Sequence, residues 1–198
     1  MPARPGRPPL TRAVYSYEEP ALLVPSELVL DTSFVVDSLI TTQPRHAAAR
    51  TFMLRLVAEQ TTFVYNRLLE LEFAEVAFKI ACIESPVPGS WKAKRNDGRV
   101  RRRAGRLTDD LMREWNDLLT TVPNLLIELD EVSADVPRYM TRYGLASYDA
   151  AHAATAAYVE AGGIVTNDRG FGHVDESALT IFTEASGVRT CRQYRGGR

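Results

Sequence analysis

The sequence predicts an α/β fold, in which a central, mainly parallel sheet lies between two layers of helices. Short apolar runs typical of buried strands alternate with longer segments of helical periodicity. Such alternation is typical of parallel sheets covered on both faces. The length of 198 residues fits one compact domain, and 45% hydrophobic residues can supply its core. We therefore expect a single three-layer α/β/α core with additional segments attached.

The first third of the chain contains an extension and two predicted strands. Residues 1–26 combine prolines and arginines without apolar periodicity, which predicts a flexible extension outside the fold. The apolar run 27–31 is expected to form the first strand, with a helix following over 34–40. A helix over 46–58 then leads to a second strand over 62–65.

The middle of the chain contains an insertion between two helices. Apolar residues at helical spacing predict a helix over 67–83, which the prolines and glycine after Ser85 terminate. The insertion itself, residues 85–106, is rich in lysine and arginine. A helix capped at Thr108 and a third strand over 125–129 are expected next.

The last third of the chain completes the predicted sheet. Helices over 136–143 and 147–161 precede strands over 163–166 and 179–182. The folded domain would then span residues 27–185, and the remaining residues, 186–198, would form a basic, frayed tail.

Several classes of protein are excluded by missing features. No apolar run reaches the roughly 20 residues of a membrane span and no secretory signal is visible, so we expect a cytoplasmic protein without a membrane partner. Cys82 and Cys191 are far apart in sequence, which predicts reduced thiols. The residues after Asp31 lack the glycines of a dinucleotide site. No lysine follows the strand over 179–182, as a receiver-like phospho-acceptor would need.

Three aspartates occupy positions where a parallel sheet brings side chains together. Asp31 and Asp168 each follow a short apolar run, so both are expected at the carboxyl edge of the sheet. Asp149 begins the helix that leads to the strand before Asp168. Each aspartate also suits a local role, as a helix cap, a charge at a helix N-terminus or a turn residue. Both kinds of role can hold at once.

The segments around these aspartates resemble a known family. Leu28-Val-Leu-Asp31-Thr-Ser, Tyr148-Asp149-Ala-Ala-His152 and Ile164-Val-Thr166-Asn167-Asp168-Arg-Gly-Phe are similar, in order and separation, to three motifs of PIN domains, particularly VapC-type toxins. The resemblance covers roughly residues 27–182. It implies a three-layer α/β/α PIN-like fold, cleavage of RNA that depends on Mg²⁺ or Mn²⁺, and often a cognate antitoxin bound as inhibitor.

The resemblance also implies which residues form the site. Four acids would be both catalytic and metal-binding, because hard divalent cations prefer carboxylate oxygens: Asp31, Glu72, Asp149 and Asp168. Glu70 and Glu75 compete with Glu72 for the second position, and any of the three could belong to a solvated helix face. Polar neighbours expected to position the acids or a water are Thr32, Ser33, Thr166 and Asn167. His152 is expected to be a packed or surface histidine rather than a ligand.

The insertion is expected to bind RNA phosphates, although a solvated, flexible loop is the simpler interpretation of any charge run. Within a chain of formal net charge -1, it gathers eight cations, namely Lys92, Lys94, Arg95, Arg99, Arg101, Arg102, Arg103 and Arg106. Antitoxin binding is a close rival. A PIN-type nuclease for RNA processing without an antitoxin, and a catalytically inactive RNA-binding scaffold, stay open as alternatives, as does a homodimer.

Overall fold

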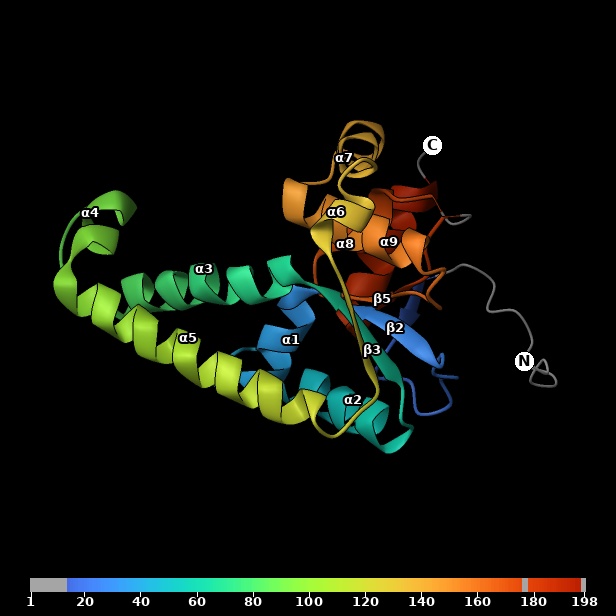
Figure 1. The fold of residues 1–198 in the computed structure, drawn as a ribbon, viewed down its shortest axis with the longest axis horizontal. Coiled ribbons are helices and arrows are strands. Elements are labelled where there is room, and N and C mark those ends of the chain that lie inside the picture. The colour runs from blue at the N-terminus through green and yellow to red at the C-terminus, as the bar shows by residue number, and fades with distance from the viewer. Residues whose placement is uncertain (1–13, 176–177, 197–198) are drawn as a thin grey trace.

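The computed structural model describes residues 14–175 and 178–196, and its core is one parallel sheet (Figure 1). In these residues the sheet has six strands in the order β1-β6-β5-β2-β3-β4, and every pair of neighbours is parallel. The strands are β1 Val14–Ser16, β2 Glu27–Leu30, β3 Thr62–Asn66, β4 Asn124–Ile127, β5 Ile164–Val165 and β6 Ile181–Thr183.

Helices connect the strands and cover the sheet. They are α1 Thr32–Leu39, α2 His46–Ala58, α3 Arg67–Glu84, α4 Trp91–Asn96, α5 Gly98–Leu119, α6 Leu129–Val132, α7 Val136–Tyr143, α8 Ser147–Tyr158, the 3-10 helix η1 Arg169–His173, and α9 Ala185–Gly196. Within the described part of the chain, no helix combines the length and apolar character that crossing a membrane requires.

Alternating side chains of the strands form two separate cores. Leu28 and Leu30 of β2 belong to a cluster with residues of α1, α2, α3 and α5, whereas Val29 belongs to a cluster with residues of α6, α7, α8 and α9. This alternation follows from the period of two in a β-strand. The expected three-layer α/β/α, PIN-like arrangement with a parallel central sheet is thereby confirmed.

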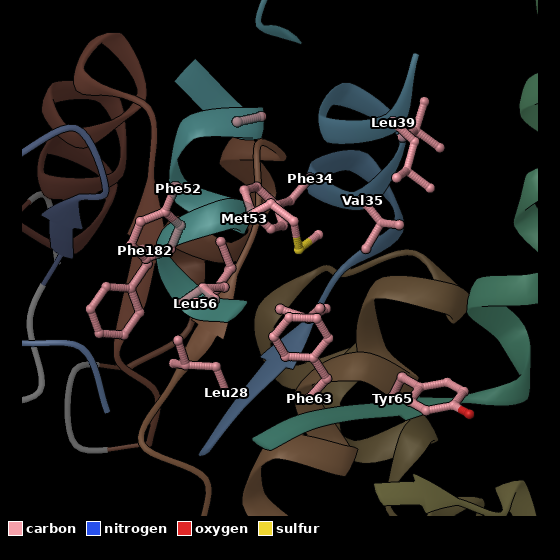
Figure 2. Close-up of a cluster of buried hydrophobic side chains, with 14 of the residues drawn as sticks. Leu28, Phe34, Val35, Leu39, Phe52, Met53, Leu56, Phe63, Tyr65 and Phe182 are labelled. Carbon is pink, nitrogen blue, oxygen red and sulfur yellow. The ribbon is translucent and has the colours of Figure 1, made fainter. Parts of the chain in front are cut away.

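The first core is rich in aromatic side chains (Figure 2). Phe34 of α1 and Phe52 of α2 meet edge to face, with ring centroids 6.0 Å apart. Phe63 of β3 stacks on Trp115 of α5 at 6.5 Å. Since each of these side chains is almost fully buried, each contributes about 1.5–3 kcal/mol to stability through burial. The core therefore fixes α1 against α2 and α5 against β3.

Helices α3 and α5 run side by side beyond the body of the molecule and form an arm, which α4 closes at its tip (Figure 1). Small residues allow this contact, because Ala77 and Ala81 of α3 pack with Val100 and Ala104 of α5. Helix α5 begins ten residues before the predicted cap at Thr108, since the Asp97 carboxylate accepts hydrogen bonds from the first backbone N–H groups. The basic insertion is thus largely helical and not a loop.

Both ends of the predicted domain differ from expectation. Part of the supposed extension forms β1, in which Val14 is buried and pairs in register with Ile181. Part of the supposed tail forms α9, whose Cys191 is buried. These short segments gain their stability from contacts distant in sequence, so their local pattern does not reveal them. The flexible character expected for residues 1–13 and 197–198 concerns positions outside the described residues.

Candidate active site

Asp31 lies at the carboxyl end of β2 and is almost completely buried. As the N-cap of α1, its carboxylate accepts hydrogen bonds from the backbone N–H of Ser33, at 3.3 Å, and from the Ser33 hydroxyl. The Thr166 hydroxyl donates to the same oxygen at 2.8 Å. Burial raises the pKa of Asp31, an effect that these hydroxyl groups and His152 partly offset.

Glu72 extends from α3 toward the same region. Its Oε2 atom accepts a hydrogen bond of 2.5 Å from the Thr32 hydroxyl and lies 3.2 Å from Nε2 of His152. His152 is fully buried, and the Asn66 amide nitrogen lies 3.3 Å from its Nδ1 atom. Burial opposes the charged imidazolium, but the contact with Glu72 and the charge of Asp31 outweigh burial and raise the pKa of His152.

Asp149 lies in the first turn of α8 and is half-buried. Its pKa is raised to about 7, first by burial and then by the negative charges of Asp31 and Asp168. Glu72 adds to this effect. The other three acids predicted for the site therefore all act electrostatically on Asp149, although the four come from separate segments.

Asp168 is the exposed member of the group. It follows β5 and caps η1, where its Oδ1 atom accepts a hydrogen bond of 2.7 Å from the Gly170 backbone N–H. Its own backbone N–H donates to the Thr166 hydroxyl at 2.9 Å. In residues 14–175 and 178–196, no other side chain forms a hydrogen bond or ion pair with its carboxylate. Local backbone geometry alone therefore orients this acid.

The four polar neighbours predicted to support the acids divide into two groups. Thr32, Ser33 and Thr166 each donate to a carboxylate of the site, as described above. Asn167 instead uses its backbone N–H to reach the Ser33 hydroxyl, at 2.9 Å. Its side chain turns away from the acids and binds Asp37, with 2.7 Å between the Asn167 amide nitrogen and the carboxylate.

The two competitors of Glu72 are engaged elsewhere. Glu70 forms an ion pair with Arg67 at 3.0 Å. Glu75 accepts two hydrogen bonds from Arg95, at 2.7 and 2.6 Å, and this contact lowers its pKa. Of the three glutamates, Glu72 is the one that contacts residues surrounding Asp31.

The donor set has the chemistry of a site for a hard divalent cation, because it consists of carboxylates whose charges repel one another. The arrangement is not that of a closed metal site, however. Among the residues that the structure describes, no group of three or more His, Cys, Asp or Glu side chains is placed so that it could hold a metal ion. Hydroxyl groups engage Asp31 and Glu72 in this arrangement.

The eight cations of the basic insertion lie on the arm. Three have partners within it: Arg95 pairs with Glu75, Arg103 pairs with Glu84, and Lys94 donates to the Cys82 and Ser85 carbonyl oxygens. In the described part of the chain no ion pair engages the other five, which are exposed: Lys92, Arg99, Arg101, Arg102 and Arg106.

Sequence reasoning did not assign three polar residues that contact the acids or their neighbours. Asn66 ends β3, and its place after an apolar run, equivalent to that of Asp31, was a usable signal. His152 lies three residues after Asp149, on the same face of the helix. It is packed, as expected, but it also contacts Glu72. Asp37 gave no signal, because an acid in a helix is ordinarily solvated.

Comparison with known proteins adds one finding. The family model described as PIN domain matches residues 28–177. No curated protein matches the chain. The matched segment contains all four acids described above, as well as the arm.

Proposed function

We propose, because the chain belongs to the PIN-domain family, that it is a metal-dependent endoribonuclease that hydrolyses RNA phosphodiester bonds. PIN domains are generally nucleases and generally use divalent metal ions, so the family supports the hydrolase class. We infer in addition that the substrate is RNA and that the cut is made within the RNA strand.

One observation supports the proposal above all others. The pKa of Asp149 is raised to about 7, in part because Asp31 and Asp168 place negative charge near it. Crowded carboxylates with a perturbed pKa are characteristic of functional sites. Asp31, Glu72, Asp149 and Asp168 would hold Mg²⁺ or Mn²⁺, since hard cations prefer carboxylate oxygens. When bound, such an ion polarises a phosphate oxygen and lowers the pKa of a coordinated water.

The protein's own groups would orient and balance this site. Thr32 holds Glu72, while Ser33 and Thr166 hold Asp31, so the carboxylate oxygens have fixed directions. His152 faces Glu72 from a fully buried position and offsets negative charge there. With a pKa of about 7, Asp149 carries a proton in a large fraction of molecules at neutral pH.

The arm is the part of the chain best suited to contact RNA beyond the cleaved bond. Five exposed cations on it have no ion-pair partner among the described residues, and such groups bind phosphates by releasing counterions. Arg95 and Arg103, by contrast, are paired with acids of α3 and stabilise the arm. Helix α3 also carries Glu72, so the arm and the acids share one helix.

The biological role that we propose is the toxin of a VapBC-type toxin–antitoxin pair, with a cognate antitoxin as inhibitor. The alternative with the same chemistry is a PIN-type RNA-processing nuclease without an antitoxin. Co-expression with the product of a small neighbouring gene distinguishes them. A toxin arrests growth when expressed alone and is rescued by that product, whereas a processing nuclease is indifferent to it.

A second candidate is a catalytically inactive RNA-binding scaffold that uses the arm. It is favoured by the finding that no group of three potential ligands in the described residues is placed to hold a metal ion. The deciding experiment is an endonuclease assay on total cellular RNA with Mg²⁺, with Mn²⁺ and with EDTA. Cleavage that EDTA abolishes supports the enzyme, whereas RNA binding without cleavage in either metal supports the scaffold.

A further inference from the structure

The position of Asp168 depends on the turn that carries it. Its carboxylate is exposed and accepts a hydrogen bond from the Gly170 backbone, two residues further on. What fixes the acid must therefore act on the backbone of the turn formed by residues 166–168. The Thr166 and Ser33 hydroxyls each accept one backbone N–H of this turn.

A buried polar chain holds the middle residue of the turn. The Tyr17 hydroxyl donates to Oδ1 of Asn167 at 3.0 Å, and the Asn167 amide nitrogen donates to the Asp37 carboxylate at 2.7 Å. All three residues are at most 6% exposed. Both ends of the Asn167 amide are thus fixed, and its orientation is fully determined. Arg45 lies beyond Asp37, at 3.7 Å.

Tyr17 comes from a part of the chain outside the family match. That match begins at residue 28, whereas Tyr17 follows β1 and continues its pairing through a backbone hydrogen bond of 3.0 Å to Thr183. Its ring packs against both Phe34 and Phe52, with centroids 5.6 and 5.3 Å away. Packing alone would be satisfied by phenylalanine. A buried hydroxyl costs stability unless it has a partner, and here its partner is Asn167.

We infer that Tyr17 and Asp37 are positioning residues, which act through Asn167 to hold the backbone of the turn, and so the Asp168 carboxylate, in its place in the site. The edge strand β1 therefore contributes to the active site as well as to the sheet. This inference deepens the proposed function and rests on it for two points, namely that the site binds a divalent cation and that the substrate is RNA. The polar chain itself does not depend on that proposal.

The test removes one oxygen atom. Tyr17→Phe keeps the ring packing and leaves Oδ1 of Asn167 without its donor. In the metal-free protein, hydrogen–deuterium exchange of the peptide that contains residues 164–170 should become faster, because the turn is less well held. Mn²⁺ affinity, measured by calorimetry, and kcat on RNA should each fall about 10-fold, as is typical when a group supporting a metal ligand is lost. KM for RNA should not change, because Tyr17 contacts Phe34, Phe52 and Asn167, which lie outside the arm.

Two control variants separate positioning from stability. Tyr158→Phe removes an exposed hydroxyl group that donates a hydrogen bond of 3.1 Å to Glu131. Tyr158 lies at the opposite end of α8 from Asp149. Val132→Ala truncates a buried side chain of α6 and lowers stability without touching the polar chain. Neither should accelerate exchange at residues 164–170 or weaken Mn²⁺ binding. If Val132→Ala reproduces the effects of Tyr17→Phe, or Tyr17→Phe behaves like the unmodified protein, the inference is overturned.

A double-mutant cycle tests the route through Asn167. Asn167→Ala should reproduce the faster exchange, and adding Tyr17→Phe to it should have no further effect. Additive effects would show that Tyr17 acts by another route and would overturn the inference. The exchange measurement needs neither metal nor RNA. A chain that failed to bind Mn²⁺ or to cut RNA would therefore refute the proposed function, while the exchange data would still decide the role of Tyr17.

Discussion

Nε2 of the fully buried His152 lies 3.2 Å from Oε2 of Glu72 and 3.8 Å from Oδ1 of Asp31. One imidazole therefore lies close to two carboxylates, one at the carboxyl end of β2 and the other on helix α3. Because burial disfavours a lone charge, this grouping is stable only if the positive and negative charges are balanced together. The balance explains how two acids can be held close to one another before any cation binds.

The first prediction concerns the acids at the strand ends. Asp31→Asn and Asp168→Asn should each reduce RNA cleavage at least about 100-fold, because each removes a negative charge at the proposed cation site. The fold should persist, since asparagine is an equally good helix cap. Cleavage rates and circular dichroism measure the two effects. Asp110→Asn, an exposed acid on the arm, is the control, and unmodified rates in Asp31→Asn would refute the site.

The second prediction ranks the glutamates of α3. Glu72→Gln should abolish cleavage, because Glu72 contacts Thr32 and His152 beside Asp31. Glu70→Gln and Glu75→Gln should retain activity at saturating RNA, because their partners are arginines outside the site. Parallel rate measurements on the three variants test the ranking. If Glu70→Gln lost activity and Glu72→Gln kept it, the metal-binding role proposed for Glu72 would belong to Glu70 instead.

The third prediction follows from the raised pKa of Asp149. This pKa of about 7 lies well above 3.8, the ordinary value of an aspartate, so folding favours the protonated form. The associated stability is present below about pH 4 and is lost as pH rises through 7. Asp149→Asn should therefore raise the Tm of the metal-free protein, and by more at pH 8 than at pH 5. Melting curves at both values test this, and an equal shift at both would contradict the shifted pKa.

The fourth prediction concerns the cation. Millimolar Mg²⁺ or Mn²⁺ should raise the Tm, because a ligand that binds the folded state stabilises it by about 2.7 kcal/mol at a concentration of 100 Kd. The increase should be larger at pH 8, where Asp149 has lost its proton. Asp168→Asn should show a smaller increase. A Tm that neither ion changes would count against a cation site formed by these carboxylates.

The fifth prediction concerns the arm. Replacing Arg101, Arg102 and Arg106 by Ala should weaken RNA binding across many sequences, because these exposed cations have no ion-pair partner among the described residues. The slope of log affinity against log salt should fall by about 2, at about 0.7 per phosphate contact on a single strand. Stability should barely change. Arg113→Ala, at an exposed pair on the same helix, is the control, and equal slopes would remove the arm from the RNA interface.

The sequence was sufficient to predict those parts of the fold and site for which the local residue pattern and the topology of the sheet agree. The strands before Asp31 and Asp168 were recognisable as apolar runs, and a parallel sheet brings the ends of such strands to one edge. Glu72 could not be separated from Glu70 and Glu75 by pattern, because all three lie within six residues of one helix. Only the packing of α3 against the sheet decides which of them faces Asp31.

The remainder could not be predicted because it depends on contacts between distant segments. The strand β1 has three residues and is held in the sheet by its pairing with β6, so the local sequence does not predict it. Helix α5 extends through the arginine-rich segment because Val100 and Ala104 pack against α3. A run of arginines carries no information about that surface, and the sequence alone favours a loop there.

The pairing of β1 with β6 also has a consequence in time. Val14 pairs with Ile181, so β1 leaves the ribosome well before the strand with which it pairs. At about 5–20 residues per second, the interval is on the order of ten seconds. For most of that time Tyr17 has no Asn167 to bind, and neither Asp149 nor Asp168 has been made. The candidate site therefore stays incomplete until the last of its four acids, Asp168, has been synthesised.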